Sequence, residues 1–203
     1  MVEWTAKDMR RAVELWTLAA EVGSIAALYS LGNAYDYGKG VQQDMTTSVE
    51  FFTKAAMQGH AESRKEHYSP PARGGRRGSL RMLDAHFDLG NAYRQGHGVQ
   101  QDNAKGAEFY TKAAMQGHAE SRYNLGYIEA LRGNHNRAVR HWLITAKMGD
   151  KPSLEAIKNT FKAGFATKEQ YAEALKGYQD AVEKMKSHDR DEAKAIREQI
   201  KAG

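Results

Sequence analysis

An internal repeat is the feature that most constrains the fold of this chain. The string KAAMQGHAESR occurs at residues 54–64 and again at 112–122. Extending the match backwards aligns 25–60 with 83–118, and 22 of the 36 aligned positions are identical. A period of this length is typical of helical repeat arrays, in which each repeat needs a neighbour to bury its apolar face.

Two further copies are less complete. The segment 119–150 aligns with 83–118 but is four residues shorter, because the loop that contains GVQQD is trimmed to a shorter one that contains RGNHN. Residues 12–23 match 48–59 and form the second half of a copy. The expected organisation is a half-repeat helix at 5–23, repeat 1 at 25–60, a basic Pro/Gly/Arg-rich insertion at 61–82 that we expect to be disordered, repeat 2 at 83–118, a shortened repeat 3 at 119–150, capping helices at 152–186 and a charged tail at 187–203.

Each copy is predicted to contain two helices. Leu28, Leu31, Gly32 and Tyr35 are spaced i, i+3, i+4 and i+7, so they share one helical face. A glycine within a helix costs about 1 kcal/mol relative to alanine. The glycine at this position recurs in every full copy, and we therefore expect a neighbouring helix to approach closely there.

The ends of the helices are also marked in the sequence. The first helix is expected to stop at Gly38 or Gly96, where a positive φ is available, and Asp44 or Asp102 is expected to cap the second helix. Farther along, Thr167 and Gln170 have the spacing of a capping box that opens a longer helix. Since no stretch alternates with period two, the predicted fold is all-α.

The pattern A-L-Y-x-L-G-x-A-Y-x-x-G-x-G-V-x-x-D at 27–44, followed by K-A-A-x-x-G at 54–59, resembles a Sel1-like repeat, a relative of the tetratricopeptide repeat. The resemblance covers roughly residues 10–150. It implies an α/α right-handed superhelical solenoid that serves as an adaptor for protein complexes. The insertion and the shortened third loop depart from the family pattern.

No group of residues points to catalysis. Gly-x-Gly-Val at 38–41 and 96–99 has neither the preceding strand nor the third glycine of a nucleotide loop, so an inter-helix turn is the better interpretation. There is no HExxH motif, no calcium-type acidic loop and no serine elbow. The chain has no cysteine, which excludes thiolate zinc sites and a cysteine nucleophile. We therefore predict a protein that is not an enzyme and has no cofactor and no metal site.

The insertion holds most of the net charge. Residues 65–82 carry +4 of the formal +5, so the remaining chain is nearly neutral. Arg73-Gly74-Gly75 resembles an RGG element, although nucleic-acid binding is disfavoured because no aromatic residue accompanies it. Ser79 follows two arginines in the pattern of a basophilic kinase site and is the predicted phosphosite. The alternative function is therefore a regulatory or RNA-contacting protein that acts through 65–82; an accident of sequence, such as a retained intron, also stays open.

In helix-pair solenoids the exposed side of the first helices commonly lines the concave surface. The predicted protein-binding residues of this surface are Ser30, Asn33, Tyr37, Asp88, Asn91, Gln95, Asn124, Tyr127 and Leu131. Amides, one acid, tyrosines and a leucine suit a peptide or a partner helix.

We therefore expect a non-catalytic adaptor that binds protein partners. Recruitment to a ubiquitin-ligase-type complex in trans and homodimerisation through an end helix stay open. No apolar run approaches the roughly 18 residues of a membrane span, so no membrane partner is expected. The N-terminal residues lack the apolar core of a secretory signal, and the chain has no cysteine. A cytoplasmic location is expected, with the nucleus left open and secretion excluded.

Overall fold

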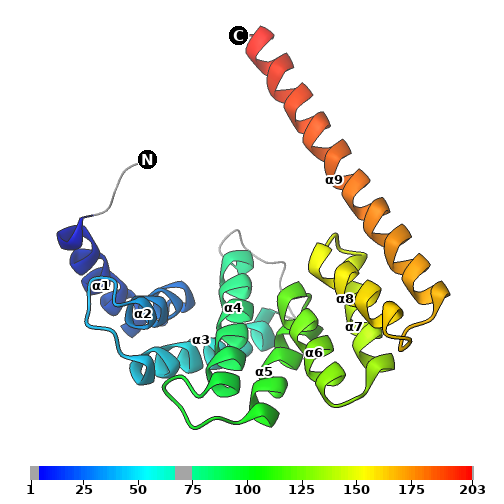
Figure 1. The fold of residues 1–203 in the computed structure, drawn as a ribbon. Helices are drawn as coiled ribbons and strands as arrows, with labels where there is room; N and C mark the ends of the chain where they lie inside the picture. The colour runs from blue at the N-terminus through cyan, green and yellow to red at the C-terminus, as the bar shows by residue number, and fades with distance from the viewer. Residues whose placement is uncertain (1–4, 67–74, 203) are drawn as a thin grey trace. The chain divides into compact units, whose positions relative to one another are not determined.

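The computed structural model describes residues 5–66 and 75–202, and every regular element within them is a helix (Figure 1). The helices are α1 (Ala6–Glu21), α2 (Ile25–Tyr37), α3 (Met45–Glu66), α4 (Gly75–Gln95), α5 (Asn103–Met115), α6 (Ala119–Leu131), α7 (His135–Ala146), α8 (Lys151–Lys162) and α9 (Lys168–Ala202). The chain divides into two compact units, Met1–Ser121 and Arg122–Gly203, so that α6 begins in the first unit and ends in the second. The predicted all-α fold is confirmed.

Side-chain caps fix where the helices begin. Asp44 Oδ1 accepts hydrogen bonds from the backbone N–H groups of Thr46 and Thr47, at 2.9 and 3.2 Å. Asp102 does the same in the next repeat, and Thr167 and Gln170 form a reciprocal capping box at the start of α9. Each cap satisfies backbone donors that the first turn of a helix leaves open. The capping residues expected from the sequence are thus confirmed.

The helical glycines mark the closest contacts between the two helices of a repeat. A Cβ atom placed on Gly90 would lie 2.5 Å from ring carbons of Tyr110, and one on Gly32 would lie 2.5 Å from Phe52. In the third copy the corresponding neighbour of Gly126 is Trp142. An aromatic ring of the second helix therefore fills the space that a side chain on the first helix would need.

In the first unit, α1 to α5 pack as successive neighbours along the chain, and α2 also contacts α4 (Figure 1). This last contact places the first helices of repeats 1 and 2 side by side. The core between them is built from Ile25, Leu28, Val49, Phe52, Ala55, Ala56, Ala85, Leu89 and Ala92. The alanines permit the close helix spacing, and the larger residues supply the apolar area that stabilises it.

The second unit has a core of its own, to which α7, α8 and α9 contribute. Val139, Trp142, Ile157 and Ala174 are its central buried residues. Two buried hydroxyl groups, on Thr145 and Ser153, hydrogen-bond each other at 2.6 Å. This bond gives each of these polar groups a partner inside the apolar core.

The structure differs from the expected disorder of the insertion 61–82 at both ends. Helix α3 continues through Glu66, and α4 begins at Gly75. Met82 is only 1% exposed, so the start of α4 is held by an apolar side chain in the interior. Residues 67–74 lie outside the described part of the chain. At the other end of the molecule, α9 runs on to Ala202 through the segment expected to be a charged tail.

Candidate functional site

The nine residues predicted to bind a partner lie on the first helices of the repeats, α2, α4 and α6. Helices α2 and α4 pack against each other in the first unit, so the structure brings six of the nine together. Asn124, Tyr127 and Leu131 lie on the part of α6 that belongs to the second unit. Tyr127 and Leu131 are 47% and 71% exposed there, and Asn124 is half-buried.

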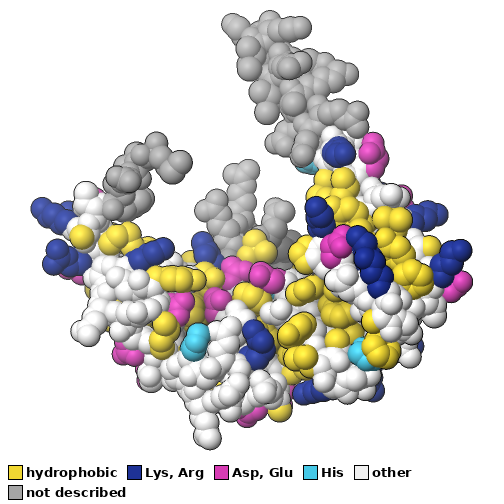
Figure 2. All heavy atoms as spheres, in the orientation of Figure 1, with side chains coloured by type: hydrophobic (Ala, Val, Ile, Leu, Met, Phe, Trp, Pro, Cys, Tyr) yellow, Lys and Arg dark blue, Asp and Glu magenta, His cyan; other side chains and the backbone are white. Residues whose placement is uncertain are grey.

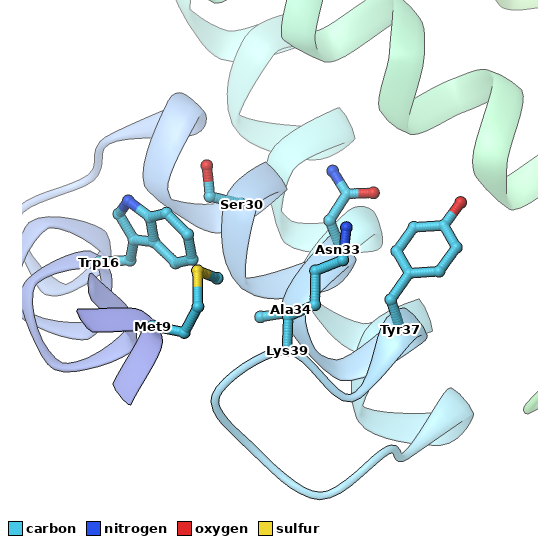
Figure 3. A pocket seen from close by; sticks show the side chains of 7 residues that line it. All are labelled: Met9, Trp16, Ser30, Asn33, Ala34, Tyr37 and Lys39. Atoms are coloured by element: carbon cyan, nitrogen blue, oxygen red, sulfur yellow. The ribbon is translucent and has the colours of Figure 1, made fainter. Parts of the chain in front are cut away.

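A pocket of about 640 Å³ lies between α1 and α2 in the first unit (Figure 3). Three of its lining residues, Ser30, Asn33 and Tyr37, belong to the predicted surface. The others are Met9 and Trp16 from α1, together with Ala34 and Lys39. Trp16 was not among the predicted residues, although the 36-residue offset pairs it with Phe52, whose ring packs against Gly32 of α2.

The rims of the pocket are chemically different. Trp16 and Met9 present apolar surface on the α1 side, whereas Asn33, Tyr37 and Lys39 lie on the opposite side (Figure 3). Tyr37 is 63% exposed, and the ammonium group of Lys39 lies 5.0 Å from the centre of its ring. A pocket with apolar walls and a few polar groups at its edge is typical of a site that holds one side chain of a ligand.

Beside this pocket, Asp88 of α4 lies in an acidic environment. Burial raises the pKa of Asp88 to about 7; a hydrogen bond from Tyr29 opposes the shift, and the nearby carboxylates of Asp84, Asp36 and Glu120 add to it. Asp88 Oδ2 is fully buried and has no hydrogen-bond partner among the described residues. Figure 2 shows acidic side chains gathered over α4.

The pocket and the carboxylates are connected through Asn33. Asn33 lines the pocket, and Asn33 and Asp88 both act on the pKa of the Tyr29 hydroxyl group. Burial, followed by the charge of Asp88, raises the pKa of Tyr29 far above its ordinary value, so the hydroxyl group stays protonated. Repeat 1 is therefore tied to repeat 2 by polar contacts on the face that carries the predicted residues.

Asn91 has a structural contact that the sequence did not predict. Its Oδ1 atom accepts a hydrogen bond from the hydroxyl group of Tyr110 at 2.6 Å. Tyr110 is fully buried and fills the space beside Gly90. Asn91 thus orients a core ring as well as facing the predicted surface, and its replacement would change packing.

Ser121, His118 and Asp84 form a chain that resembles a hydrolytic triad. His118 Nδ1 lies 2.9 Å from Ser121 Oγ, and His118 Nε2 lies 3.8 Å from a carboxylate oxygen of Asp84. However, Ser121 is 0% exposed, and its backbone N–H donates to the same Nδ1 atom. Burial lowers the pKa of His118, although Asp84 and Glu120 oppose the shift. His118 therefore caps the first turn of α6, which is a structural role.

The remaining predicted features give no further site. Ser79 falls within α4, and its side chain is outside the described part of the structure. No three His, Asp or Glu side chains among the described residues are grouped to hold a metal ion. Nor is any helix of the described chain long and apolar enough to cross a membrane.

Comparison with known proteins identifies the repeat. A family model described as "Sel1 repeat" matches residues 3–24, 25–60, 83–118 and 119–150, well over half of the chain. Among solved structures, a Sel1 repeat protein from Oxalobacter formigenes is similar, with 22% identity, a TM-score of 0.42 and coverage of 87% of this chain and 80% of that one.

A second similar structure is c5321, a protective antigen of uropathogenic Escherichia coli strains that displays an SLR fold. It shares 22% identity at a TM-score of 0.43, over 85% of this chain and 42% of its own. No curated protein matches the sequence.

Proposed function

The chain belongs to the Sel1 repeat family, and from this premise we propose that it is a non-catalytic adaptor that binds a protein partner on the surface of its first helices. Sel1 repeat proteins are commonly scaffolds for protein interaction. A repeat array suits this role because each repeat adds binding residues at a regular spacing on a rigid support.

The observation that carries the proposal is the pocket between α1 and α2. Ser30, Asn33 and Tyr37 were predicted as binding residues from their register alone, and all three line it. Trp16, a large aromatic side chain of the kind that often anchors interfaces, lies in the same pocket. A partner side chain inserted there would be held by apolar contact and oriented by the polar rim.

Two features among the described residues bear on the choice between binding and catalysis. The pKa of Asp88 is strongly raised, which in a cleft is a mark of functional sites. Its described neighbours are Tyr29 and further carboxylates. The serine beside His118 is buried, so a substrate cannot reach it. These features support binding in preference to catalysis.

Affinity capture from native lysate tests the proposal with two matched variants. Asn33→Ala with Tyr37→Ala truncates two of the polar side chains at the rim of the pocket. Glu50→Ala with Met57→Ala makes a comparable change on exposed positions of α3. We expect a discrete partner that is captured by the parent and by the α3 variant and lost from the rim variant. A partner retained by the rim variant would contradict this location.

The alternative, a regulatory or RNA-contacting role of residues 65–82, needs a variant that spares the fold. Deleting the whole segment would remove Met82 from the interior. Arg73→Gln, Arg76→Gln and Arg77→Gln together remove charge without shortening the chain. If this triple variant loses the partner, or if RNA is captured in its place, the function belongs to the basic segment. Phosphate contacts would also weaken steeply with salt.

Location and assembly are part of the same proposal. We place the protein in the cytoplasm, with the nucleus as an alternative, because a chain without cysteine needs no oxidising compartment. Membership of a larger assembly, including a ubiquitin-ligase-type complex, and homodimerisation are compatible with an adaptor. Sedimentation of the purified chain would distinguish a monomer from a dimer.

A further inference from the structure

We propose that the α2–α4 face and its pocket bind a basic segment of a partner protein, with a large apolar side chain in the pocket and a Lys or Arg beside it on the carboxylates of α2 and α4. This inference rests on the proposed adaptor function and names the chemistry of the partner. It combines an apolar cavity with the charge that lies next to it.

The pocket provides the apolar half of the recognition. At about 640 Å³ it is large enough for a leucine, methionine or aromatic side chain, and Met9, Trp16 and Ala34 supply apolar contact. Trp16 is half-buried, so it retains surface that a ligand can cover. Burying such a side chain is worth about 1.5–3 kcal/mol.

The carboxylates provide the charged half. Asp36, Asp84, Asp88 and Glu120 act together on one locality, because the charges of the other three all raise the pKa of Asp88. Among the described residues, His118 faces Asp84 and has a lowered pKa, and His97 acts on Asp36. The charged groups that act on Asp88 itself are all carboxylates.

The Oδ2 atom of Asp88 is buried and has no hydrogen-bond partner among the described residues, so the charged form of this carboxyl group is costly. The side chain of Asp84 is 38% exposed. An incoming Lys or Arg would contact the exposed carboxylate, and its positive charge would favour the charged form of Asp88. A partner bearing a phosphate or a carboxylate would instead meet repulsion.

A cation of this chain already uses the same face. The guanidinium carbon of Arg81 lies 5.0 Å from the ring centre of Tyr29, the residue that hydrogen-bonds Asp88. The face thus accommodates a guanidinium group over an aromatic ring. Arg81 is exposed, so an incoming basic side chain would repel it or displace it.

Arg81 gives the sharpest discrimination between ligand charges. If the ligand is basic, Arg81→Gln removes a like charge and raises affinity. If the ligand is acidic, the same substitution removes a partner and lowers affinity. Asp88→Asn and Asp36→Asn should have the opposite effect to Arg81→Gln, so they should lower the affinity for a basic ligand.

The experiment uses the full chain and a synthetic library of random twelve-residue peptides. We expect enrichment of sequences in which Leu, Met, Phe or Trp stands at a fixed spacing from Lys or Arg. The dissociation constant of the most enriched peptide is then measured by fluorescence anisotropy. Asp88→Asn should weaken binding by about fivefold, as expected for the loss of one negative charge close to the bound cation at a partly buried site.

Further variants and measurements keep the result interpretable. Glu50→Gln removes an exposed carboxylate from α3 and should leave affinity unchanged. Tyr37→Ala tests the pocket at an exposed position, where loss of folding is not expected, and Trp16→Ala tests it directly. Circular dichroism melts show that each variant is folded. Affinity for the peptide should also fall as salt is added.

The outcomes separate this inference from the proposed function. Enrichment of acidic peptides, absence of any enriched sequence, or binding unaffected by Asp88→Asn and Asp36→Asn would overturn the basic-segment inference. If a natural partner is still lost from the Asn33→Ala/Tyr37→Ala variant, the adaptor function stands without the basic-segment inference. If the natural partner is retained by that variant as well, the adaptor surface and the basic-segment inference are both overturned.

Discussion

The carboxyl group of Asp88 binds its proton more tightly in the folded chain than in the unfolded one. Burial is the main cause, and it raises the pKa from 3.8 to about 7. Between these two values the folded state holds more protons, so the free energy of unfolding falls as pH rises from about 4 to 7. Above pH 7 the cost of the buried charge is fully present. Tyr29, Asp36, Asp84 and Glu120 are the titratable groups that face it.

Asp88→Asn should therefore stabilise the protein in a pH-dependent way. At pH 8 we expect the variant to be about 1–2 kcal/mol more stable than the parent, below the full value of the shift because the side chain is not wholly buried. At pH 5 the difference should be only about a third of that at pH 8, because little more than a third of the interval between the two pKa values has then been crossed. Urea unfolding at both pH values measures it. An equal effect at pH 5 and pH 8 would contradict the assignment of the proton to Asp88.

A second prediction concerns the hydroxyl group of Tyr110. Tyr110→Phe leaves the ring beside Gly90 in place but removes the 2.6 Å hydrogen bond to Asn91. We expect a loss of about 1 kcal/mol, typical of one hydrogen bond. Tyr37→Phe is the matched control, since Tyr37 is 63% exposed and should not change the melting temperature. A stable Tyr110→Phe protein would mean that Asn91 finds another donor.

The hydroxyl groups of Tyr29 and Tyr110 show what cannot be predicted from the sequence. The offset of 58 pairs Tyr29 with Phe87 and Phe52 with Tyr110. The hydroxyl group thus moves from the first helix in repeat 1 to the second helix in repeat 2. Only the packing in three dimensions shows that the Tyr29 hydroxyl group interacts with Asp88 of the neighbouring repeat. The Tyr110 hydroxyl group instead donates a hydrogen bond to Asn91 of its own repeat.

At the scale of elements, α4 and α5 depend on the absence of a side chain at residue 90. Gly90→Ala improves helix propensity but places a methyl group 2.5 Å from the Tyr110 ring. The ring is fully buried, so we expect a net loss of about 1–3 kcal/mol from overpacking. The midpoint of thermal or urea unfolding measures the change.

Gly177→Ala is the control for this prediction. Gly177 lies within α9, and its added methyl group would lie 2.5 Å from Cγ of Lys147, a 51% exposed side chain that can move aside by changing its χ1 rotamer. Here the propensity gain should prevail, with a stabilisation of about 0.5–1 kcal/mol. Stabilisation by both substitutions would show that Tyr110 can move aside, contrary to the close packing described.

The elements were largely predictable because their signals are local. Helical spacing, Asp44, Asp102 and the Thr167 box each act within a few residues, and the structure confirms them. The continuation of α3 and α4 into the insertion was missed, since Met82 reveals its role only when its burial is known. The pocket was found in part. Its α2 residues follow from helical register, whereas Met9 and Trp16 required the packing of α1 on α2.

At the scale of the whole molecule, the division into units did not follow from the repeat. The sequence places repeat 3 at 119–150, but the boundary between the compact units falls after Ser121, within α6. Each unit has its own apolar core, around Leu89 in the first and Ile157 in the second. The repeat length determines which helices pair locally. The division into compact units depends instead on which buried side chains pack into the same core.

The last prediction tests whether these two cores contribute to stability separately. Ile157 and Leu89 are both 0% exposed, and truncation of such a residue to alanine costs about 2–5 kcal/mol. In a repeat array this loss is felt chiefly by neighbouring elements. We therefore expect Ile157→Ala to speed amide hydrogen exchange in α8 and α9 and to leave α2 to α4 protected. Leu89→Ala should do the reverse, with faster exchange in α3 to α5. If either substitution lowers protection equally throughout the chain, the two units unfold as one cooperative structure. Separate responses would instead place the partner surface of α2 and α4 on a unit whose stability is set by its own core.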